Sequence, residues 1–330
     1  MGGFPLNQIL KEHDWTSTSV KSSTNSVYIT TPDGTNIAAD VSVPQNGQES
    51  AKYPTVLIAT RYWRSFKMWV PQPPNSTFIG PRNDLSKYLA QRGFSIVVMD
   101  VRGTGASTGV QEAPFSESEI KDIYHVVDWI ASQPWSNGAV GATGISYEGS
   151  TSQLLALQSH PNVMAVNVAE IEMDLYDDVV YPGGILNFGF INAWSEANTY
   201  LDSNRIAPWF PFIIRLLGRG VLPVGNSTEL LEKALKDHTS NIDVYASATK
   251  VLFKDDPFGI STLQALSPLE RIKNQNQIVV PHLCWGGWLD AATARTVLTR
   301  FELFGNIPQI AIIGPWNHEM NTNCSLFKKG

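Results

Sequence analysis

The stretch that decides the fold is Gly144-Ile145-Ser146-Tyr147-Glu148-Gly149, with the apolar residues 139–144 leading into it. The apolar run predicts a strand buried on both faces, and residues 153–158 after it are helical in pattern. A serine between such a strand and helix occupies a sharp turn that holds its hydroxyl above the sheet. The usual spacing is G-x-S-x-G, whereas here Glu148 takes the second glycine position and Gly149 follows it. Ser146 is therefore a candidate nucleophile, although a lone Gly-x-Ser turn is more often structural.

Segments on both sides of this turn alternate between strand and helix patterns. Residues 36–43 alternate strictly and are expected to form a hairpin with residues 27–30 across the turn Thr31-Pro32-Asp33-Gly34. Further strands are predicted at residues 55–60, 95–99, 139–144, 163–169, 278–285 and 309–313. Helices are predicted at residues 84–92, from the capping box of Ser116 and Glu119 onward, and at residues 292–304. This repetition predicts an α/β fold with a mostly parallel, doubly wound sheet that has helices on both faces.

Residues 174–265 differ from the rest of the chain. They are rich in aromatic side chains, contain helix-period segments at 212–217 and 230–235, and have no run typical of a strand. An insertion of this kind between two sheet strands predicts a helical cap. We therefore expect residues 1–173 to form the first part of the α/β core, residues 174–265 the cap, and residues 266–330 the second part of the core.

Composition restricts the class of protein. The chain has 330 residues, of which 43% are hydrophobic and 16% charged, a globular composition. The net charge of −6 argues against a nucleic-acid partner, and no apolar run approaches the roughly 18 residues of a membrane span. Residues 1–20 lack the apolar region of a signal peptide, so we expect a cytoplasmic protein whose two cysteines, Cys284 and Cys324, are free thiols.

A second glycine-rich stretch, residues 100–109, follows a predicted strand and contains G-x-G at Gly103 and Gly105. A dinucleotide site needs G-x-G-x-x-G that opens a helix directly. Here Thr108 stands where the third glycine belongs, and residues 111–114 cannot continue a helix. We therefore interpret the stretch as a loop at the edge of the sheet, and no nucleotide cofactor is expected.

A nucleophilic serine needs a histidine base and an acid that orients it, and in this fold they follow the serine in the order acid, then histidine. Of the six histidines, only His318 follows the last predicted strand in a loop. Asp290 ends the preceding strand region in Gly286-Gly287-Trp288-Leu289-Asp290. Either residue alone is more often a surface loop residue, but three candidates in the right order favour a catalytic triad of Ser146, Asp290 and His318.

The full set of motifs resembles the X-prolyl dipeptidyl-peptidase and cocaine-esterase family of α/β-hydrolases, from about Val27 to His318. The motifs are, in chain order, Arg61-Tyr62, D-x-R-G-x-x-x-S-x-G at residues 100–109, G-x-S-Y-x-G at 144–149, Asp174-Leu175-Tyr176, Tyr181-Pro182-Gly183-Gly184, G-G-W-x-D at 286–290 and G-P-W-x-H at 314–318. This family also carries a residue other than glycine two positions after its serine, as Glu148 stands here.

The resemblance implies roles for five residues. Ser146 is the implied nucleophile, His318 the general acid and base, and Asp290 the carboxylate that holds the imidazole. The implied oxyanion hole consists of the Tyr62 hydroxyl and the backbone N–H of Tyr147, although Tyr62 alone reads as an aromatic lid on the core. The family implies no cofactor and no metal. It also implies a C-terminal β-sandwich after the histidine, and the sequence ends soon after His318, so we expect a fragment, an incomplete gene product or a reduced member.

The expected activity is hydrolysis of an ester or amide bond through an acyl-enzyme, with a small-molecule ester or a short peptide as substrate. The sequence leaves open whether the substrate is an ester or an X-prolyl peptide. Asp174, Asp177 and Asp178 could bind a substrate amine, but a solvated face is the simpler reading. The alternative from another class is a catalytically inactive hydrolase fold that acts as a binding module. The oligomeric state is not predicted.

Overall fold

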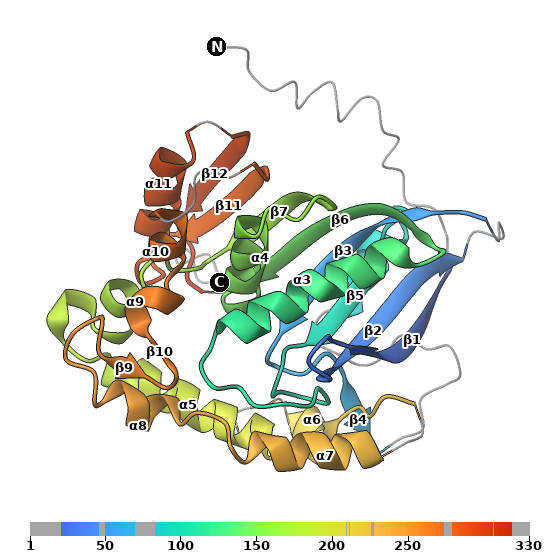
Figure 1. Ribbon diagram of the computed structural model, residues 1–330, viewed down its shortest axis with the longest axis horizontal. Coiled ribbons are helices and arrows are strands. Elements are labelled where there is room, and N and C mark those ends of the chain that lie inside the picture. Colours follow the sequence, from blue (N-terminus) through green and yellow to red (C-terminus); the bar gives the residue numbers. More distant parts are fainter. Residues whose placement is uncertain are drawn as a thin grey trace.

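The computed structural model describes residues 21–45, 50–69, 83–208, 210, 212–225, 228–273, 279–305 and 307–318. Within them, eight strands form one sheet in the order β1-β2-β5-β3-β6-β7-β11-β12 (Figure 1). The strands are Lys21–Thr30 (β1), Asn36–Gln45 (β2), Tyr53–Thr60 (β3), Ser95–Asp100 (β5), Ser136–Ile145 (β6), Val163–Ala169 (β7), His282–Gly287 (β11) and Gln309–Gly314 (β12). The pairs from β5 to β12 in this order are parallel, whereas β1 with β2 and β2 with β5 are antiparallel.

The sheet confirms the strands predicted from the sequence, with shifts at their ends. The predicted hairpin is present, and Thr30 pairs with Asn36 across its turn. Strand β6 begins at Ser136, three positions before the predicted apolar run. Strand β11 begins at His282, later than predicted, and residue 278 lies outside the described residues. Cys284 is a buried free thiol on this strand, and Cys324 lies outside the described residues.

Helices cover both faces of the sheet, as expected for a doubly wound fold. They are Asn83–Ala90 (α2), Glu117–Ser132 (α3), Tyr147–Leu157 (α4) and Thr293–Leu303 (α11). Side chains of β5 alternate between the two faces. Val97 and Met99 join the core cluster that contains α3 and α4, whereas Ile96 and Val98 join a smaller cluster with Ala90 of α2. The predicted α/β architecture, an α/β-hydrolase fold, is confirmed.

The start of α3 is a partial capping box. The Glu119 backbone N–H donates to the Ser116 hydroxyl at 3.3 Å, as the sequence pattern predicts. The Glu119 carboxylate does not return to the Ser116 backbone as the full box requires. It accepts from the Phe115 N–H at 3.2 Å instead, and this carboxylate also reaches the active-site region described below.

Residues 174–265 are mainly helical but not wholly so. The helical elements are Leu175–Val180 (η1, a π-helix), Pro182–Gly184 (η2), Phe188–Asp202 (α5), Phe212–Leu217 (α6), Glu229–His238 (α7) and Val244–Ala248 (α8), and α9 (Leu263–Leu266) begins at the end of this segment. The expectation that no strand interrupts the segment is wrong. Gly218–Val221 (β8) pairs with Phe66–Met68 (β4), and Pro257–Phe258 (β9) pairs with Ser261–Thr262 (β10). Strands of two to four residues are at or below the shortest length at which alternation is visible. Figure 1 shows α5 to α8 as a band along one end of the sheet.

The glycine-rich loop at residues 100–109 has a structural explanation. Asp100, fully buried, accepts from the Arg64 guanidinium at 2.9 Å and from the Ala106 N–H at 2.9 Å. A Cβ at Gly105 would lie 2.3 Å from the Asp100 carboxylate, and one at Gly103 would lie 2.3 Å from the Gln111 backbone nitrogen. The loop therefore needs its glycines to wrap around a buried ion pair.

Across the described part of the chain, no helix combines the length and the apolar character needed to cross a membrane.

Candidate active site

Ser146 lies in the sharp turn between β6 and α4, with φ 61° and ψ −126°. Its backbone N–H donates to the Ala169 carbonyl at 3.0 Å, which ties the turn to the end of β7. A Cβ at Gly149 would lie 2.5 Å from Ile171 Cγ2 and 2.7 Å from the Ala169 carbonyl oxygen. Glycine at 149, one position later than in G-x-S-x-G, therefore lets α4 pass close to the end of β7.

Ser146 lines a pocket between the end of the sheet and the segment 174–265. Its walls are mostly apolar and include Phe190, Ile191 and Trp194 from α5 and Tyr62 from the loop after β3. The cavity volume is about 80 Å³, room for a group of a few heavy atoms. Glu172, the charged residue of this lining, is partly accessible through the pocket, and burial raises its pKa to about 7.

Asp290 and His318 lie side by side at the ends of β11 and β12. His318 Nδ1 is 3.0 Å from both carboxylate oxygens of Asp290. The aspartate is buried and also accepts from the Thr293 hydroxyl at 3.1 Å, whereas the imidazole is 44% exposed. A carboxylate only accepts, so Nδ1 carries the proton and Nε2 is the basic nitrogen. The hydrogen bond to Asp290 raises the pKa of His318, and burial opposes this shift.

Two further carboxylates surround His318 that the sequence analysis did not identify. Glu170 is fully buried, and its Oε2 lies 3.7 Å from His318 Nδ1. The ligand atoms of Glu170, Asp290 and His318 all lie within 4.8 Å of one another, a grouping that could hold a cation. Since His318 Nδ1 already donates to Asp290, the three residues have an explanation without one. Glu170 and Glu172 both lie just beyond the strand predicted at residues 163–169. That position after a strand is the signal that could have identified them.

Tyr62 lies in the loop after β3 and lines the pocket with Ser146. The Trp194 indole N–H donates to the Tyr62 hydroxyl oxygen at 2.9 Å, so the phenolic hydrogen is directed away from Trp194. The Tyr62 ring also meets the Tyr147 ring edge-on, with centroids 6.0 Å apart. Trp194 was not singled out by the sequence analysis, because a run of aromatic residues does not show which of them faces a site.

Tyr147 is the first residue of α4, so its backbone N–H has no acceptor within the helix. Its side chain is fixed from three sides: the hydroxyl donates to Glu119 at 2.8 Å, accepts from the Gln111 amide at 3.0 Å, and the ring stacks on Phe115 at 4.4 Å. Burial raises the pKa of Glu119 to about 7, and the Tyr147 hydrogen bond opposes that shift. This arrangement holds the N-terminal turn of α4 in place.

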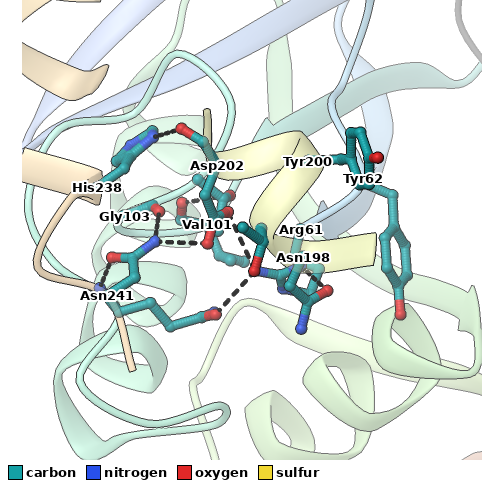
Figure 2. A network of polar contacts seen from close by, with 12 residues as sticks. Arg61, Tyr62, Val101, Gly103, Asn198, Tyr200, Asp202, His238 and Asn241 are labelled. Carbon is teal, nitrogen blue, oxygen red and sulfur yellow. Dashed lines mark hydrogen bonds and ion pairs between the residues drawn. The ribbon is translucent and has the colours of Figure 1, made fainter. Parts of the chain in front are cut away.

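Arg61 joins the loop after β3 to helix α5, and Figure 2 shows it beside Tyr62. Its guanidinium donates to Asn198, to Asp202 at 3.2 Å and to Gln111 at 3.1 Å, and it is 1% exposed. It also lies over the Trp194 ring, 5.6 Å from the centroid. Arg61 therefore fixes the same helix whose Trp194 contacts the Tyr62 hydroxyl.

The chain is similar in sequence to known proteins. A profile of the X-Pro dipeptidyl-peptidase (S15) family matches residues 33–320. A candidate serine esterase of Mycobacterium bovis is 31% identical over 322 residues, which cover 89% of this chain and 51% of that protein. The cocaine esterase of Rhodococcus sp. is 27% identical over 245 residues, which cover 72% of this chain and 41% of that protein. The chain thus spans about half the length, or less, of these relatives.

The fold has a counterpart among crystal structures. A CocE/NonD family hydrolase from Staphylococcus aureus superposes with a TM-score of 0.62 at 19% identity, over 92% of this chain and 50% of that chain. At this identity the likeness supports the fold alone. The family assignment rests on the sequence, since one family profile accounts for residues 33–320 and a relative of 31% identity extends over most of the chain. The chain belongs to the X-Pro dipeptidyl-peptidase (S15) family.

Proposed function

We propose that this chain is a serine hydrolase that cleaves an ester or amide bond through an acyl-enzyme. The observation that carries the proposal is the Asp290–His318 hydrogen bond at 3.0 Å, together with the positive-φ turn that holds Ser146 in the lining of the pocket. His318 Nε2 takes the proton of the Ser146 hydroxyl as the oxygen attacks the carbonyl carbon. It then gives that proton to the leaving alcohol or amine. A water molecule, activated by His318 in the same way, then attacks the acyl-enzyme and releases the acid and the free Ser146 hydroxyl.

The developing oxyanion needs donors aimed at it, and we assign this role to the Tyr62 hydroxyl and the Tyr147 backbone N–H. Two observations support the assignment. Trp194 donates to the Tyr62 oxygen, which orients the phenol, and Tyr147 begins α4 with an N–H that the helix does not use. One such donor contributes about 2.7 to 4 kcal/mol of transition-state stabilisation.

The pocket favours a substrate whose acyl part is small and apolar, because Phe190, Ile191 and Trp194 form one wall of it. We propose a small-molecule ester or a short peptide as the substrate class. Glu172 is the feature that separates the two: as a carboxylate it would pair with a substrate amine, and as a neutral acid near its pKa of about 7 it would donate to a carbonyl. The two roles of Glu172 are distinguished by kcat/KM for pairs of otherwise identical substrates with and without a free amine.

The first test of the proposal is Ser146→Ala. Loss of a triad member removes several orders of magnitude of rate, so hydrolysis of a p-nitrophenyl ester and labelling by a fluorophosphonate should both disappear. Ser150→Ala is the matched control, because Ser150 also lines the pocket from α4 but belongs to none of the proposed catalytic groups. Turnover near the wild-type rate in Ser146→Ala, or equal loss in both variants, would exclude Ser146 as the nucleophile.

A further inference from the structure

We propose that Glu170 is a positioning residue for His318, a second acid that can hold the imidazole in place of Asp290. The inference rests on the proposed function, because it assigns His318 the role of base. Glu170 would be an addition to the proposed triad, and neither the sequence motifs nor the chain order of the triad pointed to it.

The geometry places two carboxylates on one imidazole nitrogen. Asp290 lies at 3.0 Å from His318 Nδ1 and Glu170 Oε2 at 3.7 Å, so Asp290 makes the hydrogen bond and Glu170 lies just beyond it. The two acids come from the ends of neighbouring parallel strands, since Ala169 of β7 pairs with Trp285 of β11. A small rotation of the ring would bring Nδ1 within hydrogen-bond distance of Glu170.

The backbone holds Glu170 in this position at a cost. Its φ of 52° is in the left-handed region, which a side chain other than glycine rarely adopts. The Glu170 N–H donates to the Trp285 carbonyl at 2.9 Å, a bond that fixes the residue to the neighbouring strand. Strain of this kind persists where the surrounding structure enforces it, and it clusters at functional sites. The conformation of Glu170 therefore supports a functional role beside the distance to His318.

The charges around His318 are consistent with such a role. Among the described residues, the groups that act on the imidazole are Asp290 after β11 and Glu170 and Glu172 after β7. All three favour its protonated form, with the Asp290 hydrogen bond as the largest cause of the raised pKa. Glu172 differs from Glu170 because it lines the substrate pocket. Glu170 does not line it, so its influence on the reaction passes through His318.

The experiment compares Glu170→Gln, Asp290→Asn and the double variant, with kcat and kcat/KM for a p-nitrophenyl ester measured against pH. Gln keeps the shape of the side chain and removes the charge. In the wild-type background we expect a loss of less than about tenfold, with the acid limb of the pH profile displaced downward by about one unit. Asp290→Asn should lose about 10² in kcat, because Glu170 takes over, and the double variant should lose about 10⁴, the full cost of an unsupported imidazole.

Equal rates for Asp290→Asn and the double variant would overturn the proposal, as would an acid limb that Glu170→Gln leaves unmoved. Asp122→Asn is the control for loss of a buried carboxylate, since Asp122 pairs with Arg102 away from the triad, and its acid limb should not move. If Glu170→Gln fails to fold, Glu170→Asp withdraws the carboxylate by one methylene and should deepen the loss in Asp290→Asn. Fluorophosphonate labelling of the wild type separates the cases: no label at Ser146 contradicts the proposed function, whereas labelling without the Glu170 effect contradicts this inference alone.

Discussion

At the scale of single residues, backbone strain gathers at and beside the proposed site residues. Seven described residues other than glycine have a positive φ. Five of them lie in the pocket lining or next to a proposed site residue: Trp63, Phe115, Ser146, Glu170 and Ala291. Each such residue costs on the order of 1–3 kcal/mol and persists only where its neighbours enforce it. The surrounding sheet and helices therefore stabilise a set of side-chain positions that the local sequence would not adopt alone.

His318 leads to a prediction about pH. The base must be neutral to accept the serine proton, and the Asp290 hydrogen bond raises the pKa of the imidazole above its usual 6.5. Activity should therefore be present at alkaline pH and be lost as pH falls through a value above 6.5. The acid limb of kcat/KM for a p-nitrophenyl ester, measured between about pH 5 and 9, tests this. A limb at or below 6.5, or a flat profile, would contradict His318 as the base in this environment.

Tyr62→Phe tests the oxyanion assignment. The variant keeps the ring and removes the hydroxyl, so kcat should fall by about 10² to 10³ while KM changes little. It also removes the acceptor of the Trp194 N–H, which should lower the melting temperature. Trp194→Phe is the matched control, because it breaks the same hydrogen bond and keeps the Tyr62 hydroxyl. If both variants lose the same factor in kcat, the hydroxyl acts through packing and not as an oxyanion donor.

At the scale of elements, the sequence predicts what strand ends determine and misses what depends on long-range packing. Parallel strands bring their carboxyl ends to one edge, so Ser146, Asp290 and His318 are proposed from their places after predicted strands. Glu170 obeys the same rule one residue beyond β7 but carries no motif. Trp194 lies on α5, whose contacts are set by Arg61 some 130 positions earlier in the chain, and no periodicity reports such a contact.

Helix α4 leads to a stability prediction. Gly149→Ala would bring a Cβ to 2.5 Å from Ile171 and 2.7 Å from the Ala169 carbonyl, so α4 must move away from the end of β7. We expect a loss of about 1–3 kcal/mol in the free energy of unfolding and a loss of activity, since Ser146 sits on the displaced turn. Gly189→Ala in α5 is the matched control. A Cβ there meets nothing within 4 Å, and the change should raise stability by about 0.4–1 kcal/mol. Denaturant unfolding of both variants provides the comparison, and equal effects would contradict the close approach.

At the scale of the whole molecule, residues 174–265 are joined to the sheet by apolar and polar contacts together. One hydrophobic cluster combines Ala38 and Trp63 of the core with Leu201 and Val221 of this segment. The polar counterpart is the network in Figure 2, where Asn241 donates to the Gly103 carbonyl at 2.8 Å and to Asp202 at 2.9 Å. Because α5 also forms one wall of the pocket, whatever holds α5 on the sheet controls the shape of the site. We propose that this segment is a cap with the limits predicted from the sequence, residues 174–265.

Arg61→Lys tests that dependence. The planar guanidinium of Arg61 donates to Asn198, Asp202 and Gln111. A lysine ammonium keeps the charge but cannot make the three contacts together. We expect faster amide hydrogen exchange in α5 and a higher KM, because Phe190, Ile191 and Trp194 would be held less firmly against the pocket. Arg102→Lys is the matched control: Arg102 makes a similar fork to Asp122 at 2.7 and 2.8 Å, but within the core, so α5 should keep its protection. Hydrogen exchange with mass spectrometry measures the protection of α5 in the two variants. Equal protection would show that the apolar cluster alone holds the helix and that Arg61 does not set the shape of the pocket.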